Sequence, residues 1–169
     1  AMHDNGAMSK YATLTTISES PVTEDLLYTG SDDGLIHVSR DGGATWTRAS
    51  RLPGVPVRSF INKVEADVHT SGALFALADA HKVGDFTPYV FRSTDNGQSW
   101  RSIRGDLPDG ELPWAIQQDH VNPELLILAG ETGLWFTPNG GDDWHRLSAG
   151  APTIAFRDVK LHRRDDDIV

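Results

Sequence analysis

Short apolar runs alternate with polar turns along almost the whole chain. The runs at 35–38, 89–91 and 134–136 span three or four residues, and each ends at a polar turn that contains glycine. Apolar runs of this length between turn residues are typical of β-strands. Because no stretch sustains a 3.6-residue period, we expect helix to be almost absent. The pattern therefore predicts an all-β chain that is built from hairpins.

One eight-residue pattern, Ser/Thr-x-Asp/Asn-x-Gly-x-x-Trp, follows each of these runs. It occurs at 39–46, 93–100 and 137–144, and its Trp residues are 54 and then 44 residues apart. A repeat of this period indicates stacked supersecondary units. The first two copies are near-complete, whereas the third has Asn in place of Asp and Asp in place of Ser/Thr. The defining positions are Ser39, Asp41, Gly43 and Trp46; Ser93, Asp95, Gly97 and Trp100; and Thr137, Asn139, Gly141 and Trp144.

Each octet is typical of the turn of a β-hairpin. The Asp or Asn can accept hydrogen bonds from backbone N–H groups of the turn, and the Gly can take a positive φ. The Trp offers a large apolar surface that can lock the hairpin onto its neighbours. We interpret the octets as structural and not as calcium or catalytic sites, because Asn139 can cap a turn as well as Asp but is a poorer charged ligand or base.

The repeats divide the chain into units of four short strands. We expect blades at about 12–50, 60–104 and 114–148, and an incomplete fourth unit at 154–169 with a first strand at 155–161. Four strands per repeat at this period predict a β-propeller. We therefore expect one domain over 1–169, a partial propeller of about three and a half antiparallel blades. Residues 1–11 are expected to be a tag remnant or a flexible N-terminus.

Composition narrows the classes of partner and cofactor. The chain has 15 basic and 24 acidic residues and a net charge of −9, which argues against nucleic acid and anionic membrane surfaces as partners. There is no cysteine and hence no disulfide. No apolar run is long enough for a membrane span, and the first thirty residues contain no signal-peptide core. The seven His lack metal-ligand spacing, so we expect no metal and no cofactor.

The octet is similar to the Asp-box (BNR) motif of sialidases, xyloglucanase-type glycosidases and sortilin-type receptors, all of which are β-propellers. Nearly the whole chain, about 12–169, resembles the middle of large secreted bacterial BNR-repeat proteins that carry a glycosyl hydrolase or sortilin-like label. Besides the octets, the stretches 28–34, 87–92 and 159–165 carry this resemblance. It implies a propeller fold, Asp-boxes that serve folding on the rim, and an extracytoplasmic setting.

Two functions follow from these observations. The leading hypothesis is a non-catalytic unit that binds carbohydrate or protein, or acts as a scaffold, within a larger secreted protein. The alternative is a part of a glycoside hydrolase that forms one wall of a carbohydrate cleft. Sialidase activity is disfavoured, because the Arg-containing opening motif is missing and Tyr28 and Tyr89 lie within apolar strands. A xyloglucanase-type site needs two carboxylates across a cleft, and we identify no catalytic pair. Carboxylates that could serve are Asp32, Asp33, Asp67, Asp85, Asp119 and Glu131.

The connection at 79–88 is the strongest candidate for ligand contact. It is longer than the matching turns of the first and third units, and extra length in one turn of a repeat array is commonly where binding is built. His81, Lys82 and Asp85 could act as acids or bases, and Phe86 could form an aromatic platform. The alternative is an ordered surface loop that packs on an adjacent blade.

Three and a half blades do not close a ring. An uncovered sheet face is costly in water. Either the chain is a piece of a longer propeller, or copies of it cover each other's open blades. We therefore expect a homodimer or a higher oligomer in which terminal blades or edge strands meet.

Overall fold

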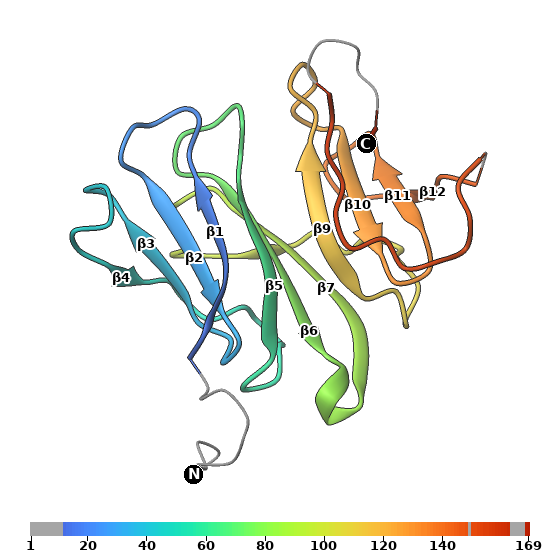
Figure 1. Ribbon diagram of the computed structural model, residues 1–169, viewed down its shortest axis with the longest axis horizontal. Coiled ribbons are helices and arrows are strands. Elements are labelled where there is room, and N and C mark those ends of the chain that lie inside the picture. Colours follow the sequence, from blue (N-terminus) through green and yellow to red (C-terminus); the bar gives the residue numbers. More distant parts are fainter. Residues whose placement is uncertain (1–11, 149, 163–167) are drawn as a thin grey trace.

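Three four-stranded sheets stand side by side in the computed structural model, which describes residues 12–148, 150–162 and 168–169 (Figure 1). The strands of each sheet follow one another in chain order and pair antiparallel, so each sheet is a simple meander. This confirms the prediction of an all-β partial propeller with four-stranded antiparallel blades. The prediction for 1–11 lies outside the described residues. Within the described part of the chain, no helix has the length and apolar character to cross a membrane.

Each blade begins at its inner strand and ends at a very short outer strand. Blade one contains β1 (Leu14–Glu19), β2 (Leu27–Ser31), β3 (Ile36–Ser39) and β4 (Thr47–Arg48). Blade two contains β5 (Phe60–Ala66), β6 (Leu74–Ala80), the 3₁₀ turn η1 (His81–Val83), β7 (Asp85–Ser93) and β8 (Arg101–Ser102). Blade three contains β9 (Pro113–Gln118), β10 (Leu126–Gly130), β11 (Leu134–Thr137) and β12 (His145–Arg146).

The hydrophobic core forms layers between neighbouring sheets. Every residue of β6 and β10 is buried, which explains why these strands are apolar on both faces. Alternate residues of β6 serve different layers, because successive side chains of a strand point to opposite faces. Leu74 packs with blade one, whereas Phe75 packs with blade three. The blades are thus joined by side chains rather than by a shared ladder of backbone hydrogen bonds.

Polar side chains tie the three inner strands together. Thr16 and Ser18 in β1 accept hydrogen bonds from the backbone N–H groups of Val64 and Ala66 in β5, at 3.3 and 2.9 Å. Asn62 Nδ2 in β5 donates to the carbonyl oxygen of Pro113 in β9 at 2.9 Å. These bonds satisfy backbone groups that would otherwise be unpaired at the inner edge of each sheet.

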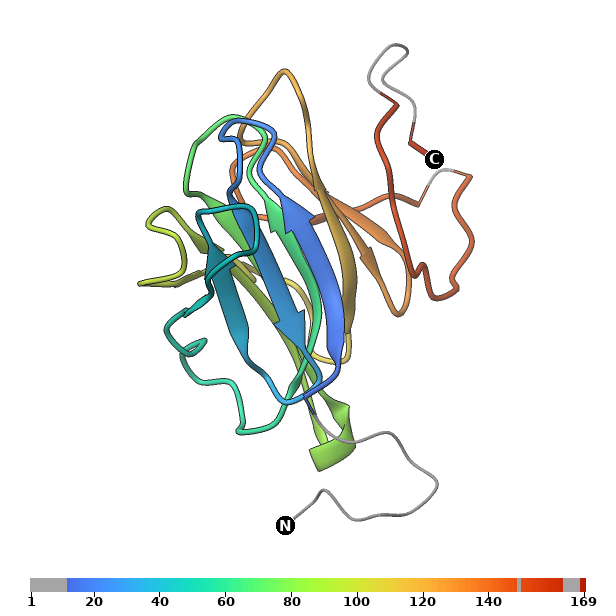
Figure 2. The ribbon, with the colours of Figure 1, turned by 60° about the vertical axis from the view of Figure 1, so that its left-hand side comes forward.

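The turns divide between two opposite rims. One rim carries the three octet turns, and the other carries the β2–β3, β6–β7 and β10–β11 turns together with the linkers between blades. The β6–β7 hairpin projects beyond its neighbours on this second rim (Figure 2). The connection expected as a long loop at 79–88 is instead largely strand, because Ala80 pairs with Asp85 and only η1 and one glycine remain as the turn.

The segment after blade three does not form the strand that was expected at 155–161. It runs across the outer side of blade three, where Phe156 N donates to the Gly130 carbonyl oxygen at 3.0 Å and Val159 is buried. Leu161 and Ile168 form an isolated antiparallel bridge. Part of the 159–165 stretch lies outside the described residues. In its described residues, the segment therefore begins a fourth layer without building a fourth sheet.

Candidate functional site

The predicted octet residues form the same compact turn in the first two blades. In the first, Ser39 Oγ donates to Asp41 Oδ1 at 2.7 Å and accepts from Gly43 N at 2.8 Å. Asp41 also receives the N–H and hydroxyl of Thr45 at 2.8 and 2.5 Å. The second octet repeats every one of these bonds, with Asp95 as the central acceptor. The oxygens of each Asp carboxylate therefore accept hydrogen bonds from groups of their own turn.

Hydrogen bonding stabilises the ionised form of both aspartates. The hydroxyl of Thr45 followed by its N–H lowers the pKa of Asp41 from 3.8 to about 2, and Ser39 adds to the effect. The hydroxyl and N–H of Ser99 likewise lower the pKa of Asp95 to about 2. A general base or acid near neutral pH needs the opposite shift. The geometry fits a structural role for these carboxylates.

The third octet keeps the turn by exchanging donor and acceptor. Asn139 Nδ2 donates to Asp143 Oδ2 at 2.9 Å, and Asn139 Oδ1 accepts from Asp143 N at 3.1 Å. Thr137 Oγ1 donates to Asn139 Oδ1 at 2.7 Å. The carboxylate has moved from the third to the seventh position of the octet and the amide has taken its place. The two changes compensate each other.

The three octet indoles differ in burial, so the expectation that the Trp packs its hairpin onto a neighbour fails for Trp46 in the described chain. Trp144 is 3% exposed and Trp100 is partly buried, whereas Trp46 is 41% exposed. Trp100 and Trp144 lie against the preceding blade. No blade precedes Trp46 in the described chain, so its indole N–H turns back to its own Gly43 carbonyl oxygen at 3.0 Å. Burial of the Trp thus depends on the neighbouring blade.

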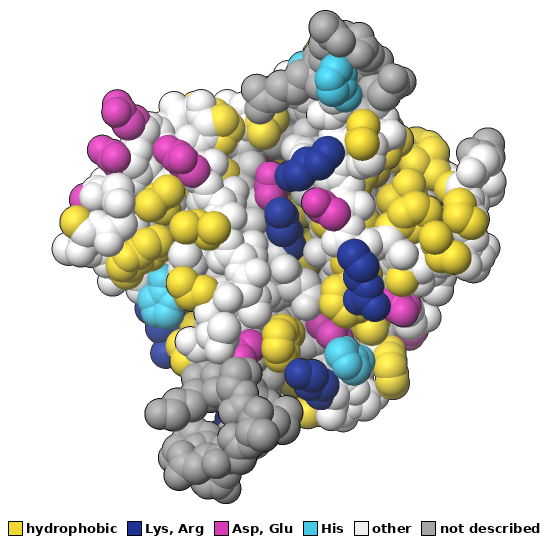
Figure 3. Space-filling view, in the orientation of Figure 1, with side chains coloured by type: hydrophobic (Ala, Val, Ile, Leu, Met, Phe, Trp, Pro, Cys, Tyr) yellow, Lys and Arg dark blue, Asp and Glu magenta, His cyan; other side chains and the backbone are white. Residues whose placement is uncertain are grey.

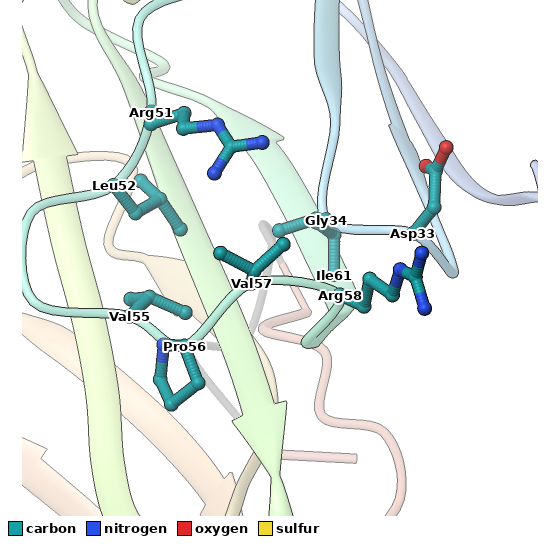
Figure 4. Close-up of a pocket in the computed structure, with 9 residues that line it drawn as sticks. All are labelled: Asp33, Gly34, Arg51, Leu52, Val55, Pro56, Val57, Arg58 and Ile61. Atoms are coloured by element: carbon teal, nitrogen blue, oxygen red, sulfur yellow. The ribbon is translucent and has the colours of Figure 1, made fainter.

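A first hollow, on the rim opposite the octets, lies at the junction of blades one and two. Leu52, Val55 and Val57 of the linker converge on it, and Arg51 lies over its edge (Figure 4). It encloses only about 20 Å³, which is about the space of one water molecule. Linker side chains fill this junction, so it offers no room for a ligand.

The equivalent junction of blades two and three holds an open groove of about 340 Å³. That volume is within the range of ligand sites. The β6–β7 hairpin, the linker, the start of β9, the β10–β11 turn and the segment after blade three all contribute to it. We call it the blade two–three groove. Its lining residues are His81, Phe86, Gly110, Leu112, Trp114, Glu131 and Arg157.

A three-residue cluster forms one wall of the groove. Trp114 Nε1 donates to Glu131 Oε2 at 2.8 Å. The Arg157 guanidinium carbon lies 3.7 Å from the Trp114 ring centroid, and Arg157 Nη2 lies 3.5 Å from Glu131 Oε2. A guanidinium over an indole face is a favourable cation–π arrangement. The wall therefore presents one positive and one negative group held against an aromatic ring.

Buried groups behind this wall fix its position. Glu131 N donates to the Leu112 carbonyl oxygen at 3.0 Å, which ties the β10–β11 turn to the linker. The carboxylate of Glu111 is buried and accepts both the N–H of Thr132, at 2.9 Å, and its hydroxyl. Because a buried carboxylate is costly unless hydrogen-bonded, these contacts hold the turn in one conformation.

The opposite wall comes from the β6–β7 hairpin. Phe86 is 52% exposed, and its carbonyl oxygen accepts Gly110 N at 2.9 Å, which binds the hairpin to the linker. The buried Asp79 orients His81. Its carboxylate accepts a hydrogen bond from His81 N at 2.8 Å and also contacts His81 Nδ1. An apolar ring and an oriented imidazole thus face the charged wall.

The structure separates the four predicted contact residues. His81 and Phe86 line the groove, but Lys82 and Asp85 do not. Lys82 Nζ lies 4.2 Å from the Phe60 ring centroid. Asp85 accepts the Tyr89 hydroxyl at 2.7 Å, and this bond, with Thr87 N, lowers the pKa of the Asp85 carboxyl. These two residues stabilise the hairpin.

Three residues of the groove were not predicted as one site. Trp114 and Arg157 were not among the predicted contact residues, and Glu131 was one of several available carboxylates. The sequence signal that distinguishes Trp114 is its position outside the octets. Arg157 lies 43 residues further along the chain, so its place over the indole depends on the fold. Among the described residues, no group of three His, Asp or Glu gathers as a metal site.

Comparisons with known proteins agree with the propeller architecture. No protein-family model matches the chain. Vacuolar protein sorting/targeting protein 10 of Arthroderma gypseum is 30% identical over 153 residues, a match that covers 82% of this chain and 9% of that protein. Its counterpart in Arthroderma benhamiae is 28% identical with the same coverage. The chain thus spans about a tenth of the curated relatives it matches.

Solved structures resemble the chain in fold at low sequence identity. The GH74 enzyme of Niastella koreensis superimposes with a TM-score of 0.70 at 14% identity, over 89% of this chain and 24% of that one. A structure of YCF48 bound to D1 peptide gives a TM-score of 0.65 at 20% identity, over 88% of this chain and 45% of that one. At these identities the likeness concerns the fold alone.

Proposed function

The chain belongs to the Asp-box (BNR-repeat) β-propeller family, and from that premise we propose that it is a non-catalytic unit that binds a polypeptide segment in the blade two–three groove. The observation that carries the proposal is the pairing of an exposed apolar ring, Phe86, with the charged wall formed by Trp114, Glu131 and Arg157. A peptide offers both apolar side chains and groups of either charge to such a groove. The YCF48 structure with a bound peptide supports this class of ligand.

The chemistry of the wall favours peptide over glycan. Sugar rings commonly stack on an open aromatic face, but Arg157 covers a face of Trp114 at 3.7 Å. Among the described residues that line the groove, Phe86 is the one other Phe, Tyr or Trp ring, since Tyr89 does not line it. A positive and a negative group at one end of an apolar groove suit an extended peptide in which apolar and charged side chains alternate.

Hydrolysis of glycosides is the alternative that the groove favours less. The usual mechanism needs two carboxyl groups that face one another across the sugar. Among the described residues that line the groove, Glu131 is the one carboxylate, and Trp114 and Arg157 already engage it. A panel of aryl glycosides incubated with the chain tests this directly. Release of the chromophore, lost in Glu131→Gln, would replace binding with catalysis as the function.

The binding proposal is tested with linear peptides selected from a random display library. Selected peptides are synthesised and titrated against the wild-type chain by calorimetry, and a glycan array serves as the parallel probe. We expect Phe86→Ala and Arg157→Ala each to weaken peptide binding at least about tenfold, or about 1.4 kcal/mol. Both side chains are largely exposed, so neither change should unfold the chain.

Val83→Ala is the matched control. Val83 is 66% exposed in the same hairpin but does not line the groove, so its replacement should leave affinity unchanged. Peptides that bind all variants equally would place the site elsewhere. Failure of the library to yield any binder, with specific retention on the glycan array, would overturn peptide binding as the function.

We also propose an extracytoplasmic setting and self-association through the open terminal blades. The setting is supported by the similarity to vacuolar protein sorting/targeting protein 10. The self-association is supported by large apolar side chains exposed on the first blade, such as Ile17 and Trp46. Exposed apolar patches mark interaction surfaces when they are contiguous.

A further inference from the structure

Inside the chain, each joint between blades is closed by the octet of the later blade. The octet reaches back onto the outer end of the earlier blade. Trp100 Nε1 donates to the Ser50 carbonyl oxygen at 3.0 Å, and Trp144 Nε1 donates to the Ile103 carbonyl oxygen at 2.9 Å. Both acceptors lie just past the outer strand of the preceding blade. The indole thus bonds to the same short segment in both joints, with the acceptor one residue further along in blade one than in blade two.

The glycine at the fifth octet position lies close to an equivalent residue of each preceding blade. A Cβ added to Gly97 would lie 2.8 Å from Ala49 Cβ, and one added to Gly141 would lie 2.7 Å from Ile103 Cβ. Ala49 N and Ile103 N each donate to the third strand of their own blade, and Leu147 N does so in blade three at 2.9 Å. Leu147 is thus the residue that a further octet would meet.

The first octet has the same turn geometry as the octets that form these joints, but no earlier blade lies against it in the described chain. Its internal hydrogen bonds match those of the second octet, yet Trp46 is 41% exposed. The atoms nearest to a Cβ on Gly43 belong to Leu27 and Trp46 of its own blade. Ile17, on the same face of blade one as Leu27, is 64% exposed. This face, which we call the octet flank, offers one half of a joint.

The outer face of blade three, part of which the segment after blade three covers, offers the other half. A hollow of about 490 Å³ lies there, and Leu147 is among its lining residues. We call this surface the receiving flank. Hydrophobic side chains gather on the two outer sides of the molecule, over the first and third blades (Figure 3). The remaining lining residues are Asp119, Val121, Asn122, Leu125, Ile127, Phe136, Leu161 and Ile168.

We propose that a second copy of this chain seats its Trp46 octet on the receiving flank at Leu147, and so continues the internal joint between molecules. The inference rests on the proposed self-association and specifies its contact. The occupant is argued from continuity, since the chain twice packs such an octet against this equivalent position. Head-to-tail contacts of this kind are heterologous.

The intermolecular joint should be weaker than the internal ones. In blades two and three, Phe91 and Trp135 pair with the second strand at the position where blade one has His37. A smaller and more polar side chain buries less apolar area in the contact. We therefore expect association that is reversible at micromolar concentrations.

Light scattering after size-exclusion chromatography tests the contact over a series from about 1 to 200 µM chain. The wild type should associate, while Trp46→Lys and Leu147→Lys should each raise the apparent Kd at least about tenfold. Val57→Lys is the matched control, because Val57 is 63% exposed and lies on the linker, away from both flanks. It should associate like the wild type.

Mixing the two variants gives the sharpest result. Trp46→Lys keeps an intact receiving flank, and Leu147→Lys keeps an intact octet flank. At concentrations between the wild-type Kd and the raised Kd of the variants, an equimolar mixture should therefore form a one-to-one heterodimer, although each variant alone is largely monomeric there. A contact between two identical flanks would not be restored by mixing the two variants. A mixture that stays monomeric would overturn the proposal.

The outcomes also separate this contact from the broader proposals. Association that survives both Lys variants overturns the Trp46–Leu147 contact and leaves self-association standing. A wild type that stays monomeric throughout overturns both. Peptide binding in the blade two–three groove is measured independently with Phe86→Ala, which lies on neither flank.

Discussion

The first and third octets invite comparison, because their sequences and their surroundings point in opposite directions. The first matches the repeat pattern well, yet its Trp46 is 41% exposed. The third departs from the pattern at two positions, yet its Trp144 is 3% exposed and donates to the preceding blade. The turn and the burial of its Trp are therefore separate properties. Local hydrogen bonds build the turn, and an adjacent sheet buries the indole.

The largest expected effect is the difference in stability loss between replacing Trp144 and replacing Trp46. Trp144→Ala should lower the free energy of unfolding by about 3–5 kcal/mol, because a large buried ring and its hydrogen bond to Ile103 are both lost. Trp46→Ala should cost less than about 1 kcal/mol in the monomer, since its ring contacts water. Urea unfolding at low protein concentration measures both. Equal losses would contradict the dependence on an adjacent blade.

A smaller effect tests the exchange of donor and acceptor in the third octet. Asn139→Asp places a second carboxylate beside Asp143 and removes the amide donor, so it should destabilise the chain by about 0.5–1.5 kcal/mol. Adding Asp143→Ser should recover most of that loss, because it recreates the second octet's arrangement of Asp95 and Ser99. Thermodynamic cycles from urea titrations give the coupling between the two positions. Additive losses would mean that the exchange is not compensatory.

The smallest expected effect is on how the free energy of unfolding changes at acid pH. Asp41 and Asp95 have folded-state pKa values near 2 against an ordinary 3.8, so they bind protons less readily in the folded chain. Their contribution to stability is present above about pH 4 and is lost as the pH falls through about 2. The double variant Asp41→Asn, Asp95→Asn should therefore unfold with a flatter pH dependence between these values. Parallel profiles for wild type and variant would refute it.

The groove differs from the octets in how far the sequence predicts it. His81 and Phe86, which the sequence singles out because they lie in one irregular connection, line the groove. Lys82 and Asp85 lie in the same connection but turn to Phe60 and Tyr89, since neighbouring side chains in a hairpin point in different directions. Trp114, Glu131 and Arg157 come from three separate segments. Their meeting depends on how blade three sits beside blade two, which no local pattern encodes.

What the sequence determines by itself is the repeated unit. Strand periodicity, turn residues and the octet act over a few neighbouring residues, so the antiparallel four-stranded blade follows from them. Only the tertiary structure decides which indole is buried, where the groove opens and which flanks stay uncovered. Each of these depends on contacts between residues that are distant in the chain. The near-complete octet around Trp46 remains open to water because burial requires an adjacent sheet, and no pattern within the octet supplies one.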